Sequence, residues 1–283
     1  MKLLDGIKLS NEIKIDIKRQ VQALKKHDIT PGLAVIIVGD DTASMTYVNM
    51  KSKACDTVGI YSIVHKMPAN INEQKIIDTI NMMNNNDNID GILVQLPLPN
   101  NIDESKVIQA INPQKDVDGF HPFNIGSISL KLDGFIPATP YGVIKLLKQY
   151  KIELKGKNVC IVGASNIVGK PLMSLFLNEY ATVQICHIYT KNLKQHTLNA
   201  DILCVAVGKI NLITSDMIKE DVIVVDIGIN KNEQGKLVGD VDFDDVSKKC
   251  EYISPVPGGV GPMTIAMLLD NTIKSAKKRK KDE

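Results

Sequence analysis

Short apolar runs alternate with amphipathic segments along almost the whole chain. In the first half the apolar runs occupy 33–38, 61–64 and 89–95, and the amphipathic segments occupy 10–27, 43–58, 71–84 and 103–110. The apolar runs have the length and the β-branched content of buried strands, whereas apolar residues three or four positions apart predict helices. Strands that alternate with helices favour parallel sheets covered by helices, so the sequence predicts an α/β fold.

The second half repeats this alternation after a predicted helix at 141–150. Strands are predicted at 158–162, 182–188, 202–207 and 222–227, with a helix at 167–179 after the first of them. We therefore expect two α/β domains with a cleft between them, where ligands commonly bind. The first domain covers 1–138 and the second, of the Rossmann type, covers 139–261; the final helix, 262–283, is expected to pack back on the first domain.

The predicted strand at 158–162 runs directly into a glycine loop. Residues 159–171 read VCIVGASNIVGKP, so Gly163, Ser165 and Gly169 stand near the glycine positions of the dinucleotide fingerprint G-x-G-x-x-G. Backbone N–H groups at the start of the following helix suit a pyrophosphate. The loop therefore predicts a dinucleotide site; the alternative is an ordinary strand-to-helix turn.

The end of the next predicted strand bears on the choice of cofactor. The ribose hydroxyls of NAD are usually held there by an acidic side chain, but residues 187–191 read HIYTK and contain no carboxylate. Lys191 could attract a 2′-phosphate or could simply be solvated. The sequence therefore favours NADP, with NAD as the alternative.

Polar residues of the first domain are candidates for chemistry. Tyr47 and Lys51 lie four residues apart on one predicted helix face, where a ring can stack on a ligand and an amine can carry a proton. Gln95 ends an otherwise apolar strand, at the carboxyl edge where parallel sheets build their sites. Asp116 and Asp118 could bind a metal or the amino groups of a ligand. The alternatives are a solvated lysine, a packing tyrosine and carboxylates that cap the loop.

A segment rich in proline and glycine precedes the final helix. Residues 255–262 read PVPGGVGP, in which glycines allow close backbone approach and prolines fix the path of the chain. The segment lacks the lysine and the spacing of a P-loop, which excludes an ATP site of that kind.

Composition excludes several other classes of protein. The 283 residues are 44% hydrophobic and 23% charged, and the formal net charge of +2 is too small for a nucleic-acid binder held by its field. No apolar run is long enough for a secretory signal or a membrane span. The five cysteines are scattered without a C-x-x-C pair, so we expect neither disulfides nor a metal site. We expect a soluble cytoplasmic protein, and we interpret the basic run 277–281 as a solvated helix end rather than a nucleic-acid or membrane patch.

Seven segments of the chain together resemble the bifunctional methylenetetrahydrofolate dehydrogenase/methenyltetrahydrofolate cyclohydrolase family. They are TASMTYVNMKSKACDTVGI, DGILVQLPLP, PQKDVDGFHPFNIG, PATPYGV, VGASNIVGKP, VVDIGIN and PVPGGVGPMT. The resemblance covers nearly the whole chain. It implies an enzyme that oxidises 5,10-methylenetetrahydrofolate with NADP and hydrolyses the methenyl product to 10-formyltetrahydrofolate, a one-carbon donor for purine biosynthesis. It also implies a homodimer.

The resemblance implies roles for residues that match the family's motifs. Lys51 would be the central catalytic residue, with Tyr47 stacked on the folate and Gln95 hydrogen-bonded nearby. Asp116 would complete this set by binding the amino edge of the pterin. The other residues implied for the folate site are Asp118, Pro257, Gly258, Gly259 and Val260. The residues implied for the cofactor are Gly163, Ala164, Ser165, Val168, Gly169, Ile188, Thr190, Gly208 and, beside the nicotinamide half, Ile229.

Three positions depart from the pattern common in the family. Ala138 stands where cysteine is common, Ala164 where some members have arginine, and Ile188 where others have a polar or basic residue. The last two could contact a 2′-phosphate, so they weaken the preference for NADP over NAD. The alternative functions are a monofunctional member of the family, a dehydrogenase of amino or hydroxy acids, and a non-enzymatic nucleotide sensor.

Overall fold

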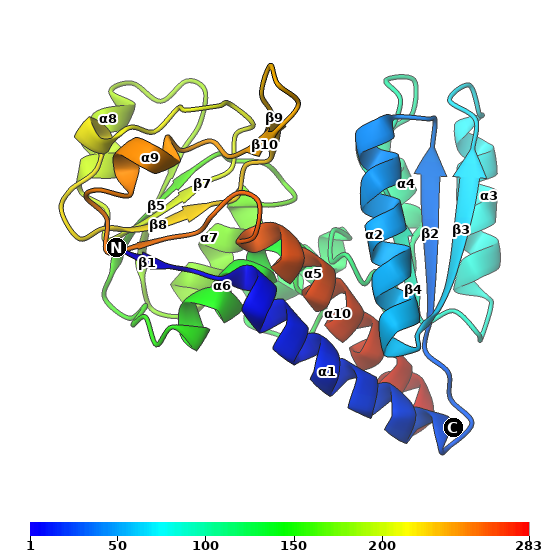
Figure 1. Ribbon diagram of the computed structural model, residues 1–283. Helices are drawn as coiled ribbons and strands as arrows, with labels where there is room; N and C mark the ends of the chain where they lie inside the picture. The colour runs from blue at the N-terminus through cyan, green and yellow to red at the C-terminus, as the bar shows by residue number, and fades with distance from the viewer. Residues whose placement is uncertain (283) are drawn as a thin grey trace. The chain divides into compact units, whose positions relative to one another are not determined.

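The computed structural model describes residues 1–282, with side chains up to Lys278, and divides into two compact units. We name the units by their sheets. The three-stranded unit comprises Glu12–Ser127, Leu132–Ala138 and the chain from Ile265 onward. The six-stranded unit comprises Met1–Asn11, Ile128–Lys131 and Thr139–Thr264. Each is an α/β unit built on a parallel sheet, which confirms the predicted fold class (Figure 1).

The three-stranded sheet places β2 (Gly32–Val38) between β3 (Tyr61–Met67) and β4 (Gly91–Val94). Both strand pairs are parallel. All seven residues of β2 are buried, as expected of a central strand that is covered on both faces. Apolar residues of β2 and β4 form one buried cluster with those of two helices, Glu73–Asn84 and Glu104–Ala110.

Helices α2 (Thr42–Val58), α3 (Glu73–Asn84) and α4 (Glu104–Ala110) connect and follow these strands. Each begins at a side chain that accepts hydrogen bonds from N–H groups of the first turn, namely Asp41, Asn72 and Asp103. Caps of this kind stabilise a helix by about 1 kcal/mol and fix its first residue. The start of α2 is therefore set locally, and with it the register of the helix that carries Lys51.

The helix α10 (Val260–Asp282) contributes its residues from Ile265 onward to the three-stranded unit. Its buried Asn271 donates hydrogen bonds to the carbonyls of Val117 at 2.8 Å and Ile136 at 2.9 Å. These two bonds attach α10 to the segment around Val117, which lies between Asp116 and Asp118. Helices α1 (Gly6–Lys25) and α5 (Pro122–Ser129) begin in one unit's range and end in the other's.

The six-stranded sheet is parallel throughout and has the order β1-β11-β8-β7-β5-β6. Its strands are β1 (Lys2–Leu3), β5 (Asn158–Val162), β6 (Thr182–Cys186), β7 (Ile202–Val205), β8 (Ile223–Asp226) and β11 (Tyr252–Ile253). After β5 the chain adds β6 on one side and then β7 and β8 on the other, which is the Rossmann arrangement. Ligands of such sheets bind outside the carboxyl ends of the strands, where the order reverses.

Helices cover both faces of this sheet. Figure 1 shows α6 (Ala138–Gln149) and α7 (Gly169–Asn178) on one side and α8 (Leu193–Leu198) and α9 (Phe243–Val246) on the other. Smaller elements are the 3-10 turn η1 (Ser215–Met217) and an antiparallel hairpin of β9 (Asn230–Lys231) and β10 (Leu237–Val238).

The predicted strands 33–38 and 158–162 agree with β2 and β5 to within one residue. The prediction was wrong for α1, which begins at Gly6 rather than at residue 10, and it missed α5 and α8. Helix α5 starts at Pro122, in a segment for which no helix was predicted, although proline is favourable in a first helical turn. The two-residue strands β1 and β11 were also missed, because they carry too few residues for a periodic pattern.

The five cysteines are buried, free thiols, and Cys160, Cys186 and Cys204 lie in β5, β6 and β7. Among the described residues, no group of histidine, cysteine, aspartate and glutamate side chains is arranged to hold a metal ion. In the same part of the chain, no helix has the length and apolar character to cross a membrane.

Candidate active site

Lys51 lies on the buried face of α2. The buried positions of this helix are Ser44, Val48, Lys51, Cys55 and Val58, three or four residues apart, so the lysine occupies a position in the apolar stripe. It is 8% exposed. Burial lowers the pKa of Lys51 below its ordinary value, because a low-dielectric environment disfavours the ammonium form. The amine can therefore be neutral during part of a reaction cycle.

Gln95 directly follows β4 and contacts Lys51. Its backbone N–H donates to the carbonyl of Ile36 at 2.8 Å, which continues the ladder with β2. Its side-chain nitrogen donates to the carbonyl of Leu96 at 2.8 Å. This bond orients the amide so that Oε1 accepts a hydrogen bond from Lys51 Nζ at 3.0 Å. The carboxyl end of β4 thus supplies a fixed polar partner for the buried amine.

Asp118 is the carboxylate whose negative charge affects the pKa of Lys51. Partial burial is the main cause that raises the pKa of Asp118 to about 6, while the charge of Lys51 opposes this rise and the charge of Asp116 adds to it. In return, the charge of Asp118 opposes the lowering of the lysine pKa. Amine and carboxylate therefore form a coupled pair whose protonation states depend on each other.

Asp116, two residues earlier, has a different environment. Its carboxylate accepts hydrogen bonds from the backbone N–H groups of Gly119 at 3.1 Å and His121 at 2.7 Å and from the side chain of Asn124 at 2.8 Å. Asp116 is 1% exposed, and burial raises its pKa against the effect of these donors. The carboxylate thus accepts three intramolecular hydrogen bonds and holds the loop in shape.

Asn124, on α5, completes this scaffold and was missed by the sequence analysis. Its amide nitrogen also donates to the carbonyl of Pro113 at 3.0 Å, and its oxygen accepts from the N–H of Phe135 at 3.1 Å. Asn124 is buried, so these bonds exchange little with water. A single side chain therefore joins the start of the loop, Asp116 and the segment around Phe135.

Tyr47 lies one helical turn before Lys51 on α2 and is partly buried. Burial raises the pKa of its phenol, which keeps the side chain neutral. Residues four apart on a helix share one face, so a ligand that reaches Lys51 also meets the tyrosine ring.

The glycine loop between β5 and α7 is closely packed. Gly163 has φ +118°, and a Cβ there would lie 2.2 Å from the carbonyl oxygen of Ala206. A Cβ on Gly169 would lie 1.9 Å from the carbonyl oxygen of Gly163. Ser165 is exposed, and its hydroxyl accepts a hydrogen bond from the N–H of Val168 at 3.2 Å. Glycine is required at both positions, and the bare backbone of the loop suits close approach of a phosphate.

The other predicted cofactor residues stand at the carboxyl ends of neighbouring strands of the same unit. Ala164 follows β5 within the glycine loop, and Ile188, which is 91% exposed, follows β6. Thr190 accepts a hydrogen bond from the N–H of His187 at 2.9 Å, which fixes that turn. Gly208 and the exposed Ile229 follow β7 and β8. The structure thus brings these residues to one edge of the six-stranded sheet.

The proline- and glycine-rich segment belongs to the six-stranded unit. The carbonyl of Gly258 accepts hydrogen bonds from Gly6 at 3.0 Å and Ile7 at 3.1 Å, and the N–H of Gly259 donates to Pro255 at 2.8 Å. The segment therefore caps the first turn of α1 before it leads into α10. The structure places Pro257, Gly258, Gly259 and Val260 in this unit, and Tyr47, Lys51, Gln95, Asp116 and Asp118 in the three-stranded unit.

Two further buried carboxylates, Asp226 and Asp240, were passed over by the sequence analysis. Asp226 ends β8, and Asp240 follows β10. Each belongs to a short aspartate–glycine motif, DIG at 226–228 and GD at 239–240. A carboxylate next to glycine at the end of an apolar run is the signal that could have indicated them.

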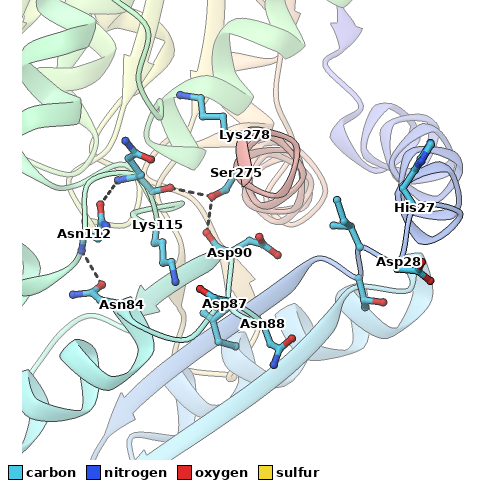
Figure 2. Close-up of a pocket in the computed structure, with 14 residues that line it drawn as sticks. His27, Asp28, Asn84, Asp87, Asn88, Asp90, Asn112, Lys115, Ser275 and Lys278 are labelled. Atoms are coloured by element: carbon cyan, nitrogen blue, oxygen red, sulfur yellow. Dashed lines mark hydrogen bonds between the residues drawn. The ribbon is translucent and has the colours of Figure 1, made fainter. Parts of the chain in front are cut away.

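A separate hollow of about 770 Å³ lies in the three-stranded unit, and Figure 2 shows its lining. It lies at the turns that precede β2 and β4, whereas Gln95 lies after β4. Its polar groups bond to one another: Asn84 accepts from the N–H of Asn112 at 2.9 Å, and the hydroxyl of Ser275 donates to the carbonyl of Asp90 at 2.7 Å. These bonds join α3 to the loop at 112–115, and α10 to the turn before β4, so the hollow is a structural junction away from the Lys51 amine.

Comparison with known proteins gives the family. Residues 4–118 match the model of the tetrahydrofolate dehydrogenase/cyclohydrolase catalytic domain, and residues 137–280 match that of the NAD(P)-binding domain of the same family. The bifunctional protein FolD of Nitratiruptor sp. is 64% identical over 282 residues, which cover 99% of this chain and 100% of the relative.

Solved structures agree with this assignment. The bifunctional methylenetetrahydrofolate dehydrogenase/cyclohydrolase of Campylobacter jejuni is 56% identical, with a TM-score of 0.97 and 99% of each chain covered. The Trypanosoma brucei enzyme, solved with NADP and an inhibitor, is 34% identical, with a TM-score of 0.93, and the match covers 97% of this chain and 96% of that one. The chain belongs to the tetrahydrofolate dehydrogenase/cyclohydrolase family.

Proposed function

We propose that this protein oxidises 5,10-methylenetetrahydrofolate to the 5,10-methenyl form with NADP and hydrolyses that product to 10-formyltetrahydrofolate. The observation that carries the proposal is the buried Lys51 amine, which donates to Gln95 at 3.0 Å and is coupled to Asp118. Membership of the dehydrogenase/cyclohydrolase family and 64% identity to a bifunctional relative support both activities.

The hydrolytic step needs proton transfer rather than a metal-activated electrophile. The methenyl carbon already carries positive charge, so water adds to it. As the adduct opens to the formyl product, one proton of the added water is released to solvent and the other is transferred to the departing nitrogen. Lys51 in its neutral form can accept that proton and then return it to the departing nitrogen, as general acid–base catalysis requires. Gln95 holds the amine at a fixed place through the 3.0 Å bond.

Asp116 and Asp118, the two aspartates of the loop, have different proposed roles. Asp116 accepts three intramolecular hydrogen bonds and is 1% exposed, so we assign it to positioning the loop that supports the folate site rather than to binding the pterin. Asp118 is partly exposed and coupled to Lys51, so it is the better candidate for contact with the folate. Tyr47 supplies a neutral ring on which the folate can stack, and residues 257–260 remain candidates for further folate contacts.

The glycine loop and the strand ends of the six-stranded unit fit a dinucleotide. Gly163 and Gly169 have no side chain that would keep a phosphate from the loop backbone. Ser165 in this loop and Thr190 in the turn after β6 carry hydroxyl groups. When bound there, NADP would supply the nicotinamide ring to which the methylene carbon gives its hydride. Residues 187–191 contain no carboxylate to repel a 2′-phosphate, and the Trypanosoma brucei relative is solved with NADP. We therefore propose NADP rather than NAD, with Gly208 and Ile229 on the nicotinamide side.

We further propose that the three-stranded unit binds folate, that the six-stranded unit binds the cofactor, and that the enzyme acts in the cytoplasm. The five free, buried cysteines suit a reducing compartment. Cell fractionation checks the location: recovery with exported proteins would contradict it.

A homodimer is supported by the free edge of the six-stranded sheet. Strand β6 pairs with β5 alone among the described strands, so its outer edge can add a strand. Leu177 and Tyr180, just before this strand, are exposed apolar residues of the same unit. We expect sedimentation equilibrium to give twice the chain mass, and a Leu177→Asp, Tyr180→Asp double variant to sediment as a monomer. A wild-type mass of one chain at micromolar concentration would refute the dimer.

The overall activity is tested by following cofactor reduction and the methenyl intermediate together, with NADP and NAD in parallel. We expect reduction of NADP to be the faster and little methenyl species to accumulate, because hydrolysis removes it. Faster reduction of NAD would overturn the cofactor assignment. Absence of reduction with either cofactor, in folded protein, would overturn the dehydrogenase activity.

Replacing the buried amine tests the hydrolytic step. Lys51→Met should lower cyclohydrolase activity by about 10²-fold or more, the usual contribution of a general acid–base group, and should leave NADP affinity unchanged. Lys53→Met changes an exposed lysine two residues along the same helix and should retain full activity. Undiminished hydrolysis in Lys51→Met would remove this residue from the mechanism.

The coupled pair predicts a pH dependence. The carboxyl pKa of Asp118 is raised to about 6, so the ionised form that pairs with Lys51 and receives folate is lost as the pH falls through that value. Cyclohydrolase kcat/KM of the wild type should therefore decline below about pH 6. Asp118→Asn should be less active and should lack this acid limb, whereas Asp56→Asn, an exposed change on α2, should keep it. An acid limb that persists in Asp118→Asn would assign it to another group.

A further inference from the structure

Asp240 is a fully buried carboxylate that holds two loops of the six-stranded unit. One oxygen accepts hydrogen bonds from the backbone N–H groups of Val207 at 2.7 Å and Gly208 at 3.1 Å. The other accepts from the N–H of Lys209 at 2.8 Å and from the side chain of Asn230 at 2.9 Å. Asp240 is 0% exposed, so four donors compensate its desolvation. Bonds to an ionised acceptor are about twice as strong as neutral ones.

The two loops that Asp240 joins follow adjacent parallel strands. Residues 207–209 follow β7 and Asn230 follows β8, and the N–H of Ile227 bonds to the carbonyl of Val205 at 2.8 Å between them. The carboxyl ends of these strands are the side on which sheets of this order bind ligands. The 207–209 loop also continues from Ala206, whose carbonyl oxygen would be 2.2 Å from a Cβ on Gly163. The carboxylate thus binds the loop that contains Gly208 and the side chain of Asn230, which directly follows Ile229.

Asp226 fixes the backbone of Asp240 in turn. Its carboxylate accepts hydrogen bonds from the N–H groups of Asp240 and Val241, both at 3.0 Å, and of Gly228 at 3.1 Å. A Cβ on Gly239 would lie 1.8 Å from the Asp226 carboxylate, and one on Gly228 would lie 2.1 Å from that of Asp240. Each carboxylate therefore lies directly against the glycine of the opposite segment. This packing leaves no room for Asp240 to shift.

We propose that Asp240 is a positioning residue for the nicotinamide half of the bound cofactor, acting through the 207–209 loop and Asn230. The inference rests on the proposed NADP-dependent oxidation. Asp240 contacts no substrate atom; it sets where Gly208 and Ile229 stand, and small displacements of groups that position a reacting atom reduce rates strongly. The adenosine half binds at the other side of the switch point, by the glycine loop and Thr190, and does not depend on this carboxylate.

The test separates the two halves of the cofactor. The variant Asp240→Asn replaces one acceptor oxygen with an N–H₂ group that faces two N–H donors. We expect its dissociation constant for NADP to rise about tenfold or more, while that for 2′,5′-ADP, which lacks the nicotinamide half, stays within about twofold. Dehydrogenase kcat should fall while the KM for folate is kept, and cyclohydrolase activity on methenyltetrahydrofolate should be unchanged. Asp242→Asn, a helix cap two residues along the chain, is the matched control and should resemble the wild type.

Each other result has a defined meaning. Unchanged NADP binding in Asp240→Asn would overturn the proposal, and so would an equal loss of NADP and 2′,5′-ADP affinity, since that would indicate a general structural role. If Asp240→Asn fails to fold, Asn230→Ala removes one of the four hydrogen bonds to Asp240. This variant should also lose affinity for NADP but not for 2′,5′-ADP, by a smaller factor. An NADP affinity equal to that of the wild type would then overturn the proposal. Wild-type protein that bound neither ligand would overturn the NADP proposal and this one together.

Discussion

A buried lysine amine is expensive to hold in a protein interior, because an ion removed from water loses several kcal/mol of solvation unless nearby groups replace it. Lys51 is placed in that situation by the register of α2, which begins at its Asp41 cap. Gln95 Oε1 at 3.0 Å and the charge of Asp118 supply the replacement. Both partners must therefore stay at fixed distances from the amine, and the rigid end of β4 and the rigid loop at 113–121 follow from that requirement.

The same physical device makes loops rigid in both units. In the three-stranded unit the buried carboxylate of Asp116 accepts two backbone N–H groups and one amide. In the six-stranded unit Asp240 accepts three backbone N–H groups and one amide. A buried carboxylate can gather several donors from segments distant in sequence, and breaking any one bond leaves charge uncompensated. Such hydrogen bonds give a loop the support that a functional group needs to keep its geometry.

The sequence predicted the longer buried strands because apolar β-branched runs such as 33–38 and 158–162 indicate burial directly. The sequence also indicated that Lys51 could be buried, because its spacing from Val48, Cys55 and Val58 places it on the same helix face as these apolar residues. A lysine on a helix is nevertheless more often solvated. The different environments of Asp116 and Asp118 could not be predicted from the sequence, because they depend on Asn124 and on contacts between residues distant in the chain. The role of Asp240 likewise depends on a loop more than thirty residues earlier in the chain.

The coupling of Lys51 with Asp118 suits a substrate that changes charge during the reaction. A cationic methenyl bridge near the amine adds a like charge, which disfavours the ammonium form and lowers the lysine pKa further. Burial lowers that pKa already, and the charge of Asp118 limits the effect. The amine is then most fully in its neutral, proton-accepting form when the electrophile is present, and it regains its proton once the formyl product has lost the positive charge. One residue can serve hydrolysis in this way without a second base, provided that the loop carrying Asp118 stays in place. The three hydrogen bonds that the buried carboxylate of Asp116 accepts hold that loop.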